Sequence, residues 1–102
     1  MRIITRRRLA DYGRSRPDAA TALRVWTTMV KHAAWRSLAE TRRDFPHADE
    51  VRVGSGRPAT VFNVRGNKYR LIVAIHYNRQ TVYVLRFLTH AEYDRDAWKG
   101  TL

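Results

Sequence analysis

The first third of the chain carries apolar residues at every third or fourth position, a pattern that predicts helices. The clearest stripe follows Pro17 and Asp18, which suit a first helical turn. Its members are Ala19, Ala22, Leu23, Trp26, Met29, Val30 and Ala33. Shorter helices are predicted at residues 6–13, ended by Gly13, and at residues 37–43, and a short buried strand at residues 1–5. One face of the long helix should therefore pack against a sheet.

The second half alternates apolar and polar positions, which predicts strands at residues 60–64, 68–77 and 81–88. Short polar turns join them, so we expect an antiparallel meander. Alternation places Tyr69, Leu71, Val73, Ile75 and Tyr77 on one face, and Lys68, Arg70, Ile72, Ala74 and His76 on the other. A two-residue turn at Arg79 and Gln80 would set His76 opposite Tyr83, which would then join the cationic face.

Residues 47–58 are rich in turn formers, and we expect a loop there. Thr89 followed by Glu92 has the spacing of a capping box and predicts a short C-terminal helix. A length of 102 residues suits one core. The sequence thus predicts an α+β fold: a small single domain over residues 1–102, with an N-terminal strand and helices packed on an antiparallel sheet.

The chain is strongly basic, because 20 Lys and Arg oppose nine acids and give a net charge of +11. Seventeen of the cations are Arg, which binds phosphate bidentately and stacks on bases. A polyanionic partner is favoured, with a solvated basic surface or an acidic protein partner as alternatives. The absence of Cys excludes disulfides and thiol nucleophiles. Neither a signal peptide nor a membrane-spanning run is evident, so a cytoplasmic protein without membrane contact is expected.

The last third collects side chains that can cleave RNA without a metal. That reaction needs a base for the ribose 2′-hydroxyl, charge to stabilise the phosphorane and an acid for the leaving 5′-oxygen. The available groups are Lys68, Arg70, His76, Arg86, His90 and Tyr93. His90 is the preferred catalyst, because the capping box explains Thr89 and Glu92 but leaves His90 unexplained.

Each of these residues also has a plain structural interpretation. Lys68 and Arg70 suit charges that protect a strand edge, and His76 suits a hydrogen-bonded strand residue. The Tyr93 ring could equally pack under the sheet.

No metal or other cofactor is expected. Asp94 and Asp96 are the closest acids to the candidate site, and no helical His pair or dense acidic cluster accompanies them. The segment Gly54-Ser55-Gly56 lacks the Lys and the flanking elements of a phosphate-binding loop, so a plain turn is expected there.

Three segments resemble the HigB family of type II toxin–antitoxin toxins, within the RelE-like messenger-RNA interferases. They are Val61-Phe-Asn-Val-Arg-Gly-Asn-Lys-Tyr-Arg-Leu71, Ala74-Ile-His76 and Leu88-Thr-His-Ala-Glu-Tyr-Asp94. The likeness covers nearly the whole chain. It implies ribosome-dependent cleavage of mRNA, growth arrest and inhibition by a HigA-type antitoxin. That antitoxin would carry a helix-turn-helix domain, through which any contact with DNA would be made.

The catalytic candidates are Lys68, Arg70, His90 and Tyr93, and the candidate RNA contacts are Arg65, Asn67, His76, Arg86 and Lys99. By the resemblance, Arg70 and Arg86 would hold the scissile phosphate, and Lys68 and His90 would share acid and base work. Tyr93 would stack a base or orient His90. Two features depart from the family pattern: Leu85 stands where many relatives have a basic residue, and the loop containing Arg57 is longer than expected.

The main alternative is a non-catalytic module that binds RNA or the ribosome through the same cationic face. Tyr77, Tyr83 or Trp98 would then serve as stacking platforms. A third possibility is an interaction protein whose charge holds an acidic partner. A DNA-binding repressor is disfavoured, because no helix-turn-helix pattern with an exposed basic helix is evident.

Overall fold

The computed structural model describes all 102 residues and has the predicted α+β architecture. In chain order the elements are β1 (Arg2–Ile4), α1 (Arg6–Ser15), the 3-10 helix η1 (Pro17–Ala19), α2 (Ala20–His32), α3 (Leu38–Asp44), β2 (Asp49–Arg52), β3 (Pro58–Val64), β4 (Tyr69–His76), the 3-10 helix η2 (Tyr77–Arg79), β5 (Thr81–Thr89), α4 (His90–Asp94) and the 3-10 helix η3 (Ala97–Thr101). The sheet order is β1-β5-β4-β3-β2. All neighbours are antiparallel except β1 and β5, so the sheet is mixed.

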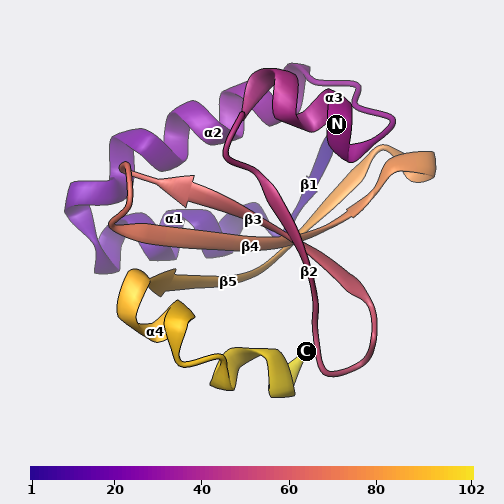
Figure 1. Cartoon of the computed structure of the whole chain (residues 1–102). Coiled ribbons are helices and arrows are strands. Elements are labelled where there is room, and N and C mark those ends of the chain that lie inside the picture. Colours follow the sequence, from indigo (N-terminus) through magenta and orange to yellow (C-terminus); the bar gives the residue numbers. More distant parts are fainter.

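Two apolar clusters lie on opposite faces of this sheet. Helices α1 and α2 cover one face, where Trp26 and Val30 of α2 join the main core with Phe62 and Leu71 of the strands (Figure 1). On the other side, α4 and the C-terminal η3 lie below the strands (Figure 1). There Trp98 belongs to a smaller buried cluster that also contains Val53, Ala59, Val61 and Ile72.

Two expectations about the elements were wrong: the end of the first helix and the loop at residues 47–58. Helix α1 continues through Gly13 to Ser15 and ends before Pro17, because the residue that precedes a proline is sterically disfavoured in the helical region. The expected loop at residues 47–58 contains strand β2, whose Val51 pairs with Ala59. Asp49 and Glu50 are poor strand formers, so pairing with β3 creates this edge strand against local propensity.

The register of the β4–β5 hairpin also differs from the prediction. The connection is the 3-10 helix η2 followed by Gln80 in the left-handed region at φ 51°, and His76 therefore pairs with Thr81. Because the shift is two residues, Tyr83 stays on the predicted face, where its ring meets that of His76 edge-on at 5.1 Å.

A bulge lies between Ile72 and Val73, where β4 advances one residue while β5 advances two. The extra residue is Leu85. Because of this extra residue, Arg86 lies opposite Ile72 and therefore on the same face as Arg70. Without the bulge, alternation would turn Arg86 toward the helices.

None of the helices has the length and apolar composition needed to cross a lipid bilayer.

Candidate functional site

Two segments that are distant in sequence meet at one end of the sheet. One is the turn between β3 and β4, and the other is the junction of β5 and α4. Tyr69 pairs with Thr89, and the backbone N–H of His90 donates to the Lys68 carbonyl at 3.1 Å. The two segments that carry the catalytic candidates are therefore in direct contact.

The predicted capping box fixes the start of α4. Thr89 Oγ1 accepts from the Glu92 N–H at 3.2 Å, and Glu92 Oε1 accepts from the Thr89 N–H at 2.9 Å. The hydrogen bond from the Thr89 backbone lowers the pKa of the Glu92 carboxyl, so this carboxylate stays charged at neutral pH. His90, the first residue of α4, consequently has a defined backbone position.

His90 also has a partner for its side chain. Its Nδ1 lies 2.9 Å from Asp94 Oδ2, one helical turn along α4. A carboxylate can only accept, so Nδ1 carries the proton and Nε2 of the neutral ring keeps its lone pair. The His90 side chain is 48% exposed. An oriented, accessible imidazole of this kind has the geometry of a general acid or base.

Asp94 was not a candidate for this role from the sequence. The spacing i,i+4 between His90 and Asp94 is the signal that could have identified it.

Arg70 is buried, with 8% of the residue exposed. Its Nη1 donates to the carbonyls of Asn67 and Tyr69, and its Nη2 donates to Asn67 Oδ1, all at 3.1 Å. The guanidinium also lies 5.7 Å from the centroid of the Tyr93 ring. Arg70 thus stabilises the turn between β3 and β4 through its hydrogen bonds to Asn67. Because Asn67 Oδ1 accepts from Arg70, the Asn67 amide NH₂ remains as a donor at an exposed position.

Tyr93 packs its ring under the sheet, which is the structural role that the sequence offered as an alternative to a role in the site. Its ring stacks on Trp98 with centroids 5.4 Å apart, and Trp98 Nε1 donates to the Tyr93 carbonyl at 3.0 Å. Burial, reinforced by the Asp49 carboxylate, raises the pKa of the Tyr93 hydroxyl. The hydroxyl therefore keeps its proton at neutral pH and can act as a hydrogen-bond donor.

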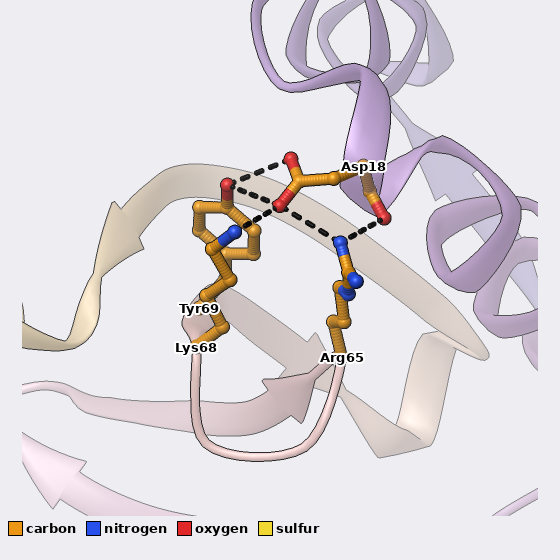
Figure 2. A network of polar contacts seen from close by, with 4 residues as sticks. All are labelled: Asp18, Arg65, Lys68 and Tyr69. Atoms are coloured by element: carbon orange, nitrogen blue, oxygen red, sulfur yellow. Dashed lines mark hydrogen bonds and ion pairs between the residues drawn. The ribbon is translucent and has the colours of Figure 1, made fainter.

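Lys68 does not share a strand face with Arg70 and His76, contrary to the prediction. It lies in the turn before β4, and its Nζ reaches Asp18 Oδ2 of η1 at 2.5 Å (Figure 2). Arg65 Nη1 approaches the same oxygen at 3.0 Å, and the Tyr69 hydroxyl donates to Asp18 Oδ1 at 2.8 Å. Hydrogen bonds from Lys68 and Tyr69 lower the pKa of Asp18 to about 2.

Residues 19–96 match the family model HigB_toxin, described as the RelE-like toxic component of a toxin–antitoxin system. The chain belongs to the HigB toxin family. It is 27% identical over 94 residues to the mRNA interferase toxin HigB of Escherichia coli (strain K12), covering 92% of this chain and 88% of that protein. The mRNA interferase HigB of Escherichia coli O6:H1 is 28% identical over 95 residues, covering 93% of this chain and 90% of that protein.

The HigB match includes every candidate site residue except Lys99. Lys99 instead pairs with Asp96 at 3.2 Å and lies 5.8 Å from the centroid of the Trp98 ring. Arg86 uses its guanidinium within the chain, donating to the Leu85 carbonyl at 2.8 Å and to Thr101 Oγ1 at 3.2 Å. Both cations therefore border the C-terminal segment.

His76 is not brought to the HigB candidate site. It lies at the opposite end of β4, roughly 20 Å from Tyr69 at the usual rise of a strand. The structure contains no group of three or more His, Cys, Asp or Glu side chains arranged to hold a metal ion.

The three possible stacking platforms differ in accessibility. Trp98 is buried. The Tyr77 hydroxyl forms a hydrogen bond with Thr41 Oγ1 at 3.2 Å, and burial raises the pKa of this hydroxyl. Tyr83 is half-buried and lies beside the exposed His76.

Proposed function

We propose that this chain is a metal-independent mRNA endoribonuclease that acts on translating ribosomes, arrests growth and is neutralised by a HigA-type antitoxin. The observation that carries the proposal is the accessible His90–Asp94 pair, attached through the Lys68 carbonyl to a cationic turn. The names of the curated relatives, which describe mRNA interferases, support the same activity.

In this mechanism His90 Nε2 removes the proton from the ribose 2′-hydroxyl, and the resulting oxygen attacks the adjacent phosphorus. The bond from phosphorus to the 5′-oxygen breaks, and that oxygen takes a proton from a nearby acid. Asp94 keeps the imidazole in the tautomer required for the first step and stabilises the imidazolium that forms. The Lys68 ammonium, released from Asp18 by an incoming phosphate, is the proposed acid.

The charge that develops on the phosphorane needs donors held in place before the reaction. We assign this role to the exposed Asn67 amide, oriented by Arg70, with Arg65 and Lys68 supplying positive charge from the same turn. Tyr93 supports the arrangement from beneath through its contact with the Arg70 guanidinium. Arg86, Lys99 and His76 would contact RNA away from the scissile phosphate.

The partners follow from the family and from the charge. A toxin–antitoxin family implies an antitoxin, and a net charge of +11 attracts both RNA and the acidic segments of a protein inhibitor. We place the protein in the cytoplasm, where ribosomes and messages are found, with DNA reached only through the antitoxin.

A reconstituted translation reaction tests the activity. The purified chain is added to translated mRNA and, separately, to the same mRNA without ribosomes, and the new RNA ends are mapped by primer extension. His90→Ala should lower the cleavage rate roughly hundredfold or more, because it removes the general base. His32→Ala is the matched control, since His32 is exposed at the end of α2.

Discrete ends that form only on translated messages, and that disappear with His90→Ala alone, are the expected result. Cleavage of free mRNA would contradict the ribosome requirement, and equal cleavage by His90→Ala would contradict the assignment of the base.

A second candidate function is a non-catalytic module that blocks translation by binding RNA or the ribosome. The half-buried Tyr83 beside His76, on the same sheet face as Arg70, favours it. Such a module would still inhibit translation after His90→Ala and would leave the messages intact.

A further inference from the structure

A single carboxylate joins the helical layer to the turn of the candidate site. Asp18 belongs to η1, between α1 and α2, yet its partners Arg65, Lys68 and Tyr69 lie about fifty residues further along the chain (Figure 2). The Tyr69 hydroxyl donates to both carboxylate oxygens, at 2.8 and 3.0 Å. Arg65 Nη1 adds a bond to the Asp18 backbone carbonyl at 3.3 Å. The turn is therefore held by the side chain and the backbone of one residue.

This arrangement differs from an isolated surface ion pair, which usually contributes little. Three donors converge on the same group, two from the turn and one from Tyr69, the first residue of β4, which is only 4% exposed. The Tyr69 ring is itself fixed by stacking on Phe87 with centroids 5.0 Å apart. Pro17, which precedes Asp18, restricts the backbone at the start of η1. Both ends of the connection are thus anchored in the fold.

The turn needs such an anchor because its backbone is unusual. Arg65 and Gly66 both occupy the left-handed region, at φ 54° and 63°. A side chain disfavours this region, so Arg65 must be held there by its surroundings. Two residues later, the Lys68 carbonyl accepts the N–H of His90 at 3.1 Å. Displacement of the turn would therefore displace the first residue of α4.

We propose that Asp18 is a positioning residue of the candidate site, which holds the turn so that the Lys68 carbonyl fixes His90. It also fixes the position of the Lys68 ammonium in the protein without bound RNA. The kinetic part of this inference rests on the proposed ribonuclease function, whereas the structural part does not.

Amide hydrogen exchange of the full chain, measured by NMR, tests the structural part without RNA. In Asp18→Ala, the His90 amide should exchange roughly tenfold faster, because its acceptor is no longer held, whereas the amides of Leu23 and Val30 in α2 should keep their protection. Tyr69→Phe removes only the hydroxyl and should give a smaller effect of the same kind. Asp11→Asn is the control, because Asp11 pairs with Arg14 on the exposed side of α1.

Unchanged exchange at His90 in both Asp18→Ala and Tyr69→Phe would overturn the inference. Equal acceleration of all amides would also overturn it, because Asp18 would then support the fold as a whole rather than His90. If Asp18→Ala does not fold, Tyr69→Phe decides the question.

Steady-state kinetics in the translation reaction test the second part with Asp18→Asn. A positioning role predicts a kcat roughly tenfold lower with KM changed less than about twofold, because misplaced groups slow the chemical step. A lower KM with unchanged or higher kcat would show instead that Asp18 only restrains Lys68, and would contradict the proposal. If the unmodified chain cleaves no RNA, the proposed function fails, while the exchange measurement still decides whether Asp18 positions His90.

Discussion

Asp18 should leave a signature in the acid stability of the protein. Its pKa is about 2 in the folded chain against an ordinary value of 3.8, chiefly because Lys68 and Tyr69 donate to it. A lowered pKa means that the stabilisation is complete above the ordinary value and is lost as the pH falls through the folded value. The melting temperature of the wild-type chain should therefore fall more steeply between about pH 4 and pH 2 than that of Asp18→Asn. Parallel curves for the two proteins would contradict this assignment.

Asp94 is the second residue whose role can be isolated. Asp94→Ala leaves His90 in place but removes the acceptor that fixes its tautomer, so the cleavage rate should fall roughly tenfold, less than for His90→Ala. Asp96→Ala is the control, because Asp96 pairs with Lys99 rather than with His90. Cleavage rates measured under single-turnover conditions would refute the role of Asp94 if its variant matched the wild type or the control variant lost as much.

At the scale of elements, the β2–β3 hairpin is docked onto the C-terminal segment through Gly54. The Gly54 N–H donates to the Lys99 carbonyl at 2.8 Å, and a Cβ on Gly54 would lie 2.9 Å from that oxygen. Gly54→Ala should force η3 away from the hairpin and loosen the cluster around Trp98, lowering the free energy of unfolding by about 1–3 kcal/mol. Urea unfolding measures the effect.

Gly100→Ala is the matched control for that substitution. A Cβ there would meet nothing within 4 Å, and Gly100 does not have a positive φ. Equal loss in the two variants would mean that the close approach at Gly54 does not matter.

Elements with local signals could be predicted from the sequence. The apolar stripe of α2 and the capping box at Thr89 depend on residues within a few positions of one another, and both are present in the structure. The strand β2 could not be predicted in the same way, because Asp49 and Glu50 become extended only through pairing with β3. The hairpin register depended on the 3-10 helix η2, which has no distinctive sequence pattern.

The position of the candidate site could be predicted from the sequence, but the directions of some of its side chains could not. The neighbouring positions of His90 and the Lys68 turn follow from a meander of three strands, which the alternation indicated. The direction of the Lys68 side chain depends on Asp18, about fifty residues away, and no periodicity connects the two. Arg86 reaches the face of Arg70 only through the bulge at Leu85. The error in the placement of Lys68 therefore reflects a contact between distant segments, and the bulge that positions Arg86 has no signal in the alternation.

Across the whole molecule, the excess of positive charge attracts polyanions in general, which is a different property from a specific binding site. Five of the nine acids lie in salt bridges with basic side chains: Asp11, Asp18, Asp49, Asp94 and Asp96. The many remaining cations draw polyanions to the surface without selecting among them. In our proposal, selection and chemistry take place at the end of the sheet where β4 and α4 begin.

Induction of the chain in a tightly repressed bacterial host, with the ends of cellular mRNA mapped by primer extension, tests whether the protein is a ribonuclease toxin that depends on His90. The wild type and His32→Ala should arrest growth and produce the same discrete new ends, and His90→Ala should restore growth and abolish them. Arrest with intact messages, or identical ends in the His90→Ala strain, would contradict the account of a ribonuclease toxin that uses His90.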